Sequence, residues 1–148
     1  MKESKKILVA EDNPKDAELM FLALKGYNLD IVHVSDGAEV LDYLYCDGKF
    51  KDREHENPVV IFLDLKMPKM DGIEVIRQIK TDENLKNIPV VMVTSSREEK
   101  DLVESYSLGV NAYVVKPVNF EKFIETIKQI GIFWALINEP PLWRLFNS

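Results

Sequence analysis

The chain has few of the features that mark a secreted, membrane-spanning or nucleic-acid-binding protein. It holds one cysteine, Cys46, among 148 residues, so it cannot form an intrachain disulfide, and a reducing compartment suits it. No apolar run approaches the length of a membrane span, and the start of the chain lacks the apolar core of a secretion signal. We therefore expect a cytoplasmic protein with no membrane partner.

Positive charge is also in short supply. The chain has 19 Lys and Arg against 25 Asp and Glu, which gives a formal net charge of -6. Sequence-independent binding to nucleic acid needs a basic face, and the basic residues near positions 2–6 and 49–53 are more typical of solvated charge than of a binding patch. We expect no nucleic-acid partner.

Hydrophobic residues are plentiful, at 46% of the chain, which is enough for one domain with a real core. Short apolar runs indicate strands, at residues 6–10, 30–34, 59–63, 89–93 and 112–115. An amphipathic segment after each run indicates a helix, and the one long connection is a polar loop at 46–57. Strand and helix therefore alternate five times, which predicts an α/β fold with a doubly wound parallel sheet.

The apolar run before Asp64 is the strongest of the five. Its residues, Val59 to Leu63, do not alternate with polar ones, as expected of a central strand that is buried on both faces. Open α/β sheets bind ligands outside the carboxyl ends of their strands. We therefore interpret Asp64 as a functional residue rather than a surface acid.

Other strand ends add polar side chains to the same edge of the sheet. Glu11 and Asp12 follow the first strand, Thr94 ends the fourth, and Lys116 follows the last. Three carboxylates in one crevice repel each other, and a hard divalent cation relieves this; magnesium fits best, with manganese as an alternative. A lysine and a hydroxyl beside the cation would complete a cradle for a phosphoryl group on Asp64.

Four motifs carry a resemblance to a known family, at residues 9–13, 63–72, 93–95 and 109–118. With these motifs, residues 6–129 resemble the receiver domain of bacterial two-component response regulators. The resemblance implies a flavodoxin-like five-stranded parallel sheet in the order 2-1-3-4-5 with helices on both faces. It also implies a signalling switch rather than an enzyme, apart from its own phosphorylation and dephosphorylation.

The resemblance assigns a role to each site residue. Asp64 would take a phosphoryl group from a sensor histidine kinase or phosphotransfer protein. Glu11, Asp12, Asp64 and the backbone carbonyl of Lys66 would hold the metal. Lys116 and Thr94 would contact the phosphoryl oxygens.

Two further residues complete the family pattern. Tyr113 stands where the family places an aromatic ring whose position depends on Thr94, so that a hydroxyl drawn toward the phosphoryl group makes room for the ring. The bond between Lys116 and Pro117 would be a cis peptide.

The end of the chain resembles stand-alone regulators that partner phytochrome-type histidine kinases, which carry a pair like Phe133-Trp134. We expect a receiver domain at 1–130 and an apolar extension at 131–148, with no separate output domain. The extension is too apolar for a free tail, which predicts that this domain or another chain covers it. A homodimer through the last strands, the last helix and the extension would do so, and the output would be contact with a downstream protein.

Two other classes of function stay open from the residues alone. A magnesium-dependent phosphohydrolase would also use an aspartyl-phosphate, but such enzymes usually carry a second acid two residues after the nucleophile, where this chain has Lys66. A flavodoxin-like cofactor binder would need hydroxyls or glycines after the first strand, and Glu11 and Asp12 would repel an anionic cofactor there.

Overall fold

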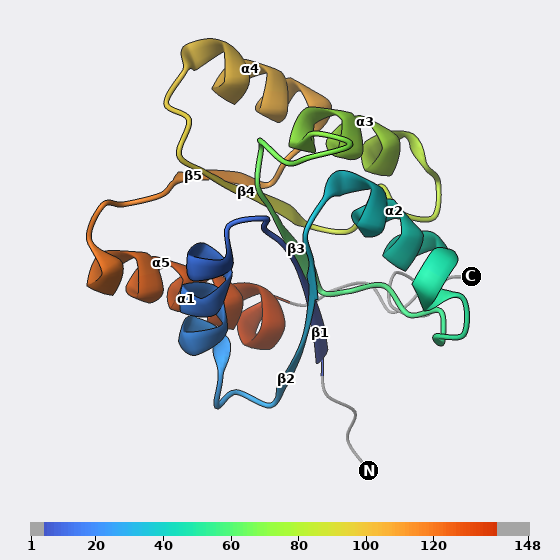
Figure 1. Cartoon of the computed structure of the whole chain (residues 1–148), viewed down its shortest axis with the longest axis horizontal. Helices are drawn as coiled ribbons and strands as arrows, with labels where there is room; N and C mark the ends of the chain where they lie inside the picture. The colour runs from blue at the N-terminus through green and yellow to red at the C-terminus, as the bar shows by residue number, and fades with distance from the viewer. Residues whose placement is uncertain (1–4, 139–148) are drawn as a thin grey trace.

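The computed structural model describes residues 5–138 and contains one five-stranded parallel sheet in the order β2-β1-β3-β4-β5 (Figure 1). This confirms the predicted sheet and its strand order. The strands are β1 Lys5–Ala10, β2 Leu29–Val34, β3 Val60–Leu63, β4 Val90–Thr94 and β5 Ala112–Val115.

Helices cover both faces of the sheet. α1 and α5 pack together on one face, and α2, α3 and α4 lie side by side on the other (Figure 1). Their bounds are α1 Pro14–Leu24, α2 Gly37–Tyr45, α3 Gly72–Thr81, α4 Glu99–Leu108 and α5 Phe120–Ile132. None of these helices, nor any other within residues 5–138, has both the length and the apolar content that a membrane crossing needs.

The sheet divides the core into two layers because successive side chains of a strand point to opposite faces. Leu8 and Ile61 pack with α2 and α3, whereas Val9 and Phe62 pack with α1 and α5. All four residues of β3 are at most 1% exposed, as the run without alternation predicts. Burial of each such side chain contributes about 2 kcal/mol.

The residues at the helix starts explain where the helices begin. The side chain of Asn13 accepts hydrogen bonds from the backbone N–H groups of Lys15 and Asp16, and Pro14 occupies the first helical position of α1. Asp71 caps α3 through the N–H of Glu74. The loops that follow β1 and β3 are therefore fixed where they enter the helices.

The connection at 46–57 has more structure than its lack of periodicity suggests. It contains a short 3-10 helix, η1 Gly48–Phe50. The guanidinium of Arg53 lies 3.8 Å from the centre of the Tyr43 ring and donates hydrogen bonds to the backbone carbonyls of Tyr43, Glu54 and Glu56. One cation thus holds the loop against α2.

The end of the described chain continues α5 beyond the expected stripe of apolar residues. A π-helical turn, η2 Phe133–Ile137, follows directly, and Ala135 in it is fully buried. The Lys5 ammonium donates a hydrogen bond to the carbonyl of Ala135, and Trp134 packs on the α1 and α5 layer. This domain therefore covers part of the apolar extension. Residues 139–148 lie outside the described residues. The predicted boundary between domain and extension at residue 130 stays a prediction, and α5 continues past it to Ile132.

Replacing Gly72 with alanine should destabilise the protein by about 1–3 kcal/mol. The new Cβ would lie 2.5 Å from the carbonyl oxygen of Asp64 and 2.9 Å from the Cα of Leu65, and neither backbone atom can move without shifting the loop after β3. Urea unfolding measures the change in free energy. Gly131→Ala is the comparison, because its Cβ would meet the end of the buried Leu24 side chain instead of backbone and should cost less. Equal stability of Gly72→Ala and the parent would contradict this packing.

Candidate functional site

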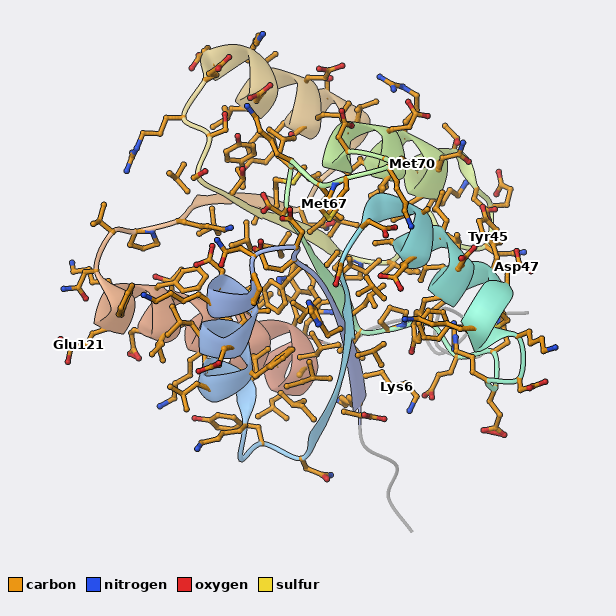
Figure 2. The ribbon with its side chains drawn as sticks, viewed as in Figure 1. Lys6, Tyr45, Asp47, Met67, Met70 and Glu121 are labelled. Atoms are coloured by element: carbon orange, nitrogen blue, oxygen red, sulfur yellow. The ribbon has the colours of Figure 1, made fainter. Side chains whose placement is uncertain are left out.

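The predicted site residues meet at one edge of the sheet. Glu11 and Asp12 leave β1, Asp64 leaves β3, Thr94 ends β4 and Lys116 leaves β5, so all five lie at the carboxyl ends of parallel strands. Figure 2 shows Met67 and Met70 on the loop that runs from Asp64 to α3. The structure thus places these predicted residues on one rim, as their positions after successive strands predict, and their roles stay predictions.

The three acids are close enough to share one cation. Each of Glu11, Asp12 and Asp64 offers a carboxylate oxygen that lies within 4.8 Å of the other two. Glu11 and Asp64 are buried, at 1% and 7% exposed, whereas Asp12 is exposed. Hard oxygen ligands in this number suit magnesium, which keeps water in its remaining positions. The Lys66 side chain is exposed, and its backbone carbonyl stays a predicted fourth ligand.

Burial and the neighbouring acids affect the pKa of Glu11. Burial raises the pKa of its carboxyl to about 7; the ion pair with Lys116 opposes the shift, and the charge on Asp64 adds to it. Burial favours the neutral form of this carboxyl, and the Lys116 ammonium 2.8 Å away compensates for its charge only in part. A divalent cation in the cluster would stabilise the charged form of Glu11.

Lys116 lies at the centre of the negative charge. Its ammonium is 2.8 Å from Glu11 Oε1, 2.8 Å from Asp16 Oδ2 and 3.3 Å from Asp64 Oδ2. Burial acts against the charged form, but the hydrogen bonds to Asp16 and Glu11 and the charge on Asp64 outweigh it and hold the pKa of Lys116 above its ordinary value. The lysine therefore stays cationic beside Asp64.

Asp16 is the site residue that the sequence analysis missed. It lies in the first turn of α1, directly after the cap at Asn13 and the proline at position 14. An acid in that position is usually explained by the helix dipole, and this common role gave no reason to connect it with Lys116. Its one detectable signal is the helix start itself, since the first turn after β1 must lie over the same edge as Asp64.

Thr94 and Tyr113 both contact the loop that follows β4. Thr94 is buried, and its hydroxyl accepts a hydrogen bond of 3.3 Å from the N–H of Ser96. The Tyr113 hydroxyl donates a hydrogen bond of 3.2 Å to the carbonyl of Ser96, and burial is the main cause that raises the pKa of this phenol. Ser96 also donates to Asp101 of α4 at 2.7 Å. The hydrogen bonds of Ser96 therefore connect Thr94 with both the Tyr113 side chain and α4.

The predicted cis peptide is wrong. No cis peptide bond occurs in residues 5–138, so the bond between Lys116 and Pro117 is trans. The trans isomer is the intrinsically preferred one by about 0.5–1 kcal/mol, and with it the Lys116 ammonium already reaches all three carboxylates.

Fold and site together define a class of protein: a parallel α/β domain with acids and a lysine gathered where a phosphoryl group can be accepted. A model of the response regulator receiver domain matches residues 7–128, and the chain belongs to this family. It is therefore a phosphoryl-accepting signalling protein of a two-component system.

Individual relatives agree with this family. The chain is 39% identical over 142 residues to the probable methanogenesis regulatory protein FilR2 of Methanothrix harundinacea, with 91% of this chain and 86% of FilR2 covered. It is 36% identical over 132 residues to the response regulator Rcp1 of Synechocystis sp., with 88% of each covered. These regulators give no support to the phosphohydrolase alternative.

Solved structures show the same fold. The phosphorylated cyanobacterial phytochrome response regulator RcpA superposes with a TM-score of 0.87 at 38% identity, and the Mn²⁺-bound form of Rcp1 with 0.86 at 34%; each comparison covers 93% of this chain and 99% of the other. The bacteriophytochrome response regulator RtBRR gives 0.74 at 53% identity, covering 93% and 84%. The resemblance to phytochrome-type regulators is thus confirmed.

Replacing Asp12 with asparagine should weaken binding of Mg²⁺ or Mn²⁺ at least about tenfold, because one anionic oxygen leaves the cluster. Asp12 is exposed, so the fold should be unaffected. Titration calorimetry measures the dissociation constant, and Asp47→Asn is the matched control because Asp47 is an exposed acid beyond the end of α2 (Figure 2). If Asp12→Asn bound the metal as tightly as the parent, Asp12 would not be a metal ligand.

Proposed function

We propose that Asp64 is the residue that accepts the phosphoryl group from a phosphohistidine of a sensor histidine kinase or phosphotransfer protein. The observation that carries this proposal is the place of its carboxylate, at the end of β3, 3.3 Å from the Lys116 ammonium and within the acidic cluster of Glu11 and Asp12. An oxygen of Asp64 would attack phosphorus while the bond from phosphorus to the histidine nitrogen breaks and its electron pair stays on the imidazole.

The acidic cluster is proposed to hold magnesium, with manganese as an alternative, through Glu11, Asp12, Asp64 and the carbonyl of Lys66. Rcp1 has been solved in a manganese-bound form, which supports a divalent site in the family. A bound cation would neutralise the charge on the phosphoryl oxygens. Within the chain itself, Lys116 would pair with one of these oxygens and Thr94 would donate a hydrogen bond to another.

The switch is proposed to begin at Thr94. If its hydroxyl turned toward a phosphoryl oxygen, it would release the N–H of Ser96 and alter the loop that also binds the Tyr113 hydroxyl. To move a two-state balance from 1:99 to 99:1, phosphorylation must favour one state by about 5.5 kcal/mol. A charge-assisted hydrogen bond, an ion pair and a metal contact can together supply this amount.

The output is proposed to be contact with a downstream protein in the cytoplasm, without nucleic acid. A homodimer through β5, α5 and the residues after 130 suits the exposed apolar side chains of η2, since Phe133, Leu136 and Ile137 are 45%, 52% and 66% exposed. We propose the receiver domain at 1–130 and the extension at 131–148 as the working division, and no catalysis beyond the protein's own phosphorylation and dephosphorylation.

Incubation with magnesium and a small acyl phosphate should add one phosphoryl group to the parent and none to Asp64→Asn, because the amide is a poor nucleophile and cannot form the acyl phosphate. Intact mass spectrometry measures the addition, and Asp47→Asn controls for the charge change. If the parent gains no mass, magnesium-dependent consumption of the donor distinguishes fast hydrolysis from an inactive site. Equal phosphorylation of Asp64→Asn would show that another residue is the acceptor.

Placing a charge on η2 should weaken a homodimer formed through this surface. Leu136→Glu puts a carboxylate on a side chain that is 52% exposed, so we expect an intact fold and at least about tenfold weaker self-association. Sedimentation velocity over a concentration series measures the change. Gln78→Glu, which adds the same charge at an exposed position of α3 outside the proposed interface, is the control. A parent that stays monomeric with and without the phosphoryl group would contradict the dimer.

A further inference from the structure

The contacts of Lys116 differ in length. Its ammonium is 2.8 Å from Asp16 and from Glu11 but 3.3 Å from Asp64, the proposed acceptor. The Lys116 side chain is 13% exposed and is largely enclosed by these acids, whereas Asp16 is 26% exposed and lies at the border with solvent. The longest of the three contacts thus belongs to the residue on which the phosphoryl group would be placed.

The first turn of α1 fixes the backbone of Asp16. The side chain of Asn13 accepts hydrogen bonds from the N–H groups of Lys15 and Asp16, and Pro14 fixes the first turn. The short aspartate side chain has little reach from this backbone. The long lysine side chain is the partner that moves, so the ion pair forms where Asp16 lies.

We propose that Asp16 is a positioning residue that competes with Asp64 and its phosphoryl group for the ammonium of Lys116. This inference rests on the proposed function of Asp64. Before phosphorylation, the lysine charge is divided among three carboxylates. After it, the phosphoryl oxygens need the same ammonium, and the contact with Asp16 must lengthen or be shared. Asp16 therefore favours the unphosphorylated state and limits how strongly the phosphorylated state is held.

The test uses beryllofluoride, which binds a carboxylate noncovalently in the place of a phosphoryl group, with saturating magnesium and the full chain. Asp16→Asn keeps the size of the side chain and removes its charge. We expect beryllofluoride to bind this variant about two- to fivefold tighter than it binds the parent. This factor corresponds to the free energy of a partly exposed ion pair. Fluorine NMR of the bound anion measures the affinity, and thermal unfolding without the anion checks the fold.

Glu18→Gln is the matched control, since Glu18 is an exposed acid on the same helix and carries the same charge. It should leave the affinity within the error of the parent value. If Asp16→Asn and Glu18→Gln give the same affinity, or Asp16→Asn binds more weakly than the parent, the competition is refuted. A weaker complex would mean that Asp16 directs the lysine toward the phosphoryl group instead.

A second pair of variants separates competition for the lysine from plain repulsion of an anion. In a Lys116→Met background, Asp16→Asn should give no gain in affinity, because the shared partner is gone. A gain that persists there would refute the competition. The proposed function is checked separately: if Asp64→Asn binds beryllofluoride as the parent does, the acceptor is wrong and the inference fails with it. If only the Asp16 comparison fails, the acceptor stands.

Discussion

Most of what is distinctive in this structure depends on one electrostatic constraint: several carboxylates and one ammonium must share a small space at the edge of a sheet. Glu11 and Asp64 are buried there, and Lys116 lies within 3.3 Å of both. Buried charges are tolerated only when they are paired. In the free protein the carboxylates at this edge outnumber the ammonium groups. A bound cation or a change at Asp64 alters this local charge directly.

The parallel sheet creates this constraint because all its strands end on the same side. β1 and β3 are neighbours in register, with Ala10 opposite Leu63, so the residues that follow them are forced together. Gly72 then lets the loop after β3 return so closely that a Cβ would meet the carbonyl of Asp64. Close packing and hydrogen bonding of the backbone therefore determine where the main chain of Asp64 lies.

Much of this was predictable, and the reasons are specific. The run from Val59 to Leu63 has no alternation because β3 is covered on both faces, and the order of strands brings Thr94 and Lys116 to Asp64. Asp16 could not be predicted from spacing, since an acid in a first helical turn has an ordinary role in its own helix. Nor could the loop held by Arg53 be foreseen, because its order comes from one cation over the Tyr43 ring. The cis Lys116–Pro117 bond was an inference from resemblance, and the structure has trans.

The burial of β3 and β4 on both faces also determines where motion can occur. Their backbone amides are shielded by two helical layers, so exchange of these hydrogens with solvent would require nearly global opening. The β4–α4 loop is less enclosed, with Ser95, Arg97 and Glu98 exposed, and loop motions are faster by orders of magnitude. In the proposed switch, a change at the β4–α4 loop would therefore spread along the rim through the hydrogen bonds of Ser96 with Tyr113 and with α4, while the sheet beneath stays rigid.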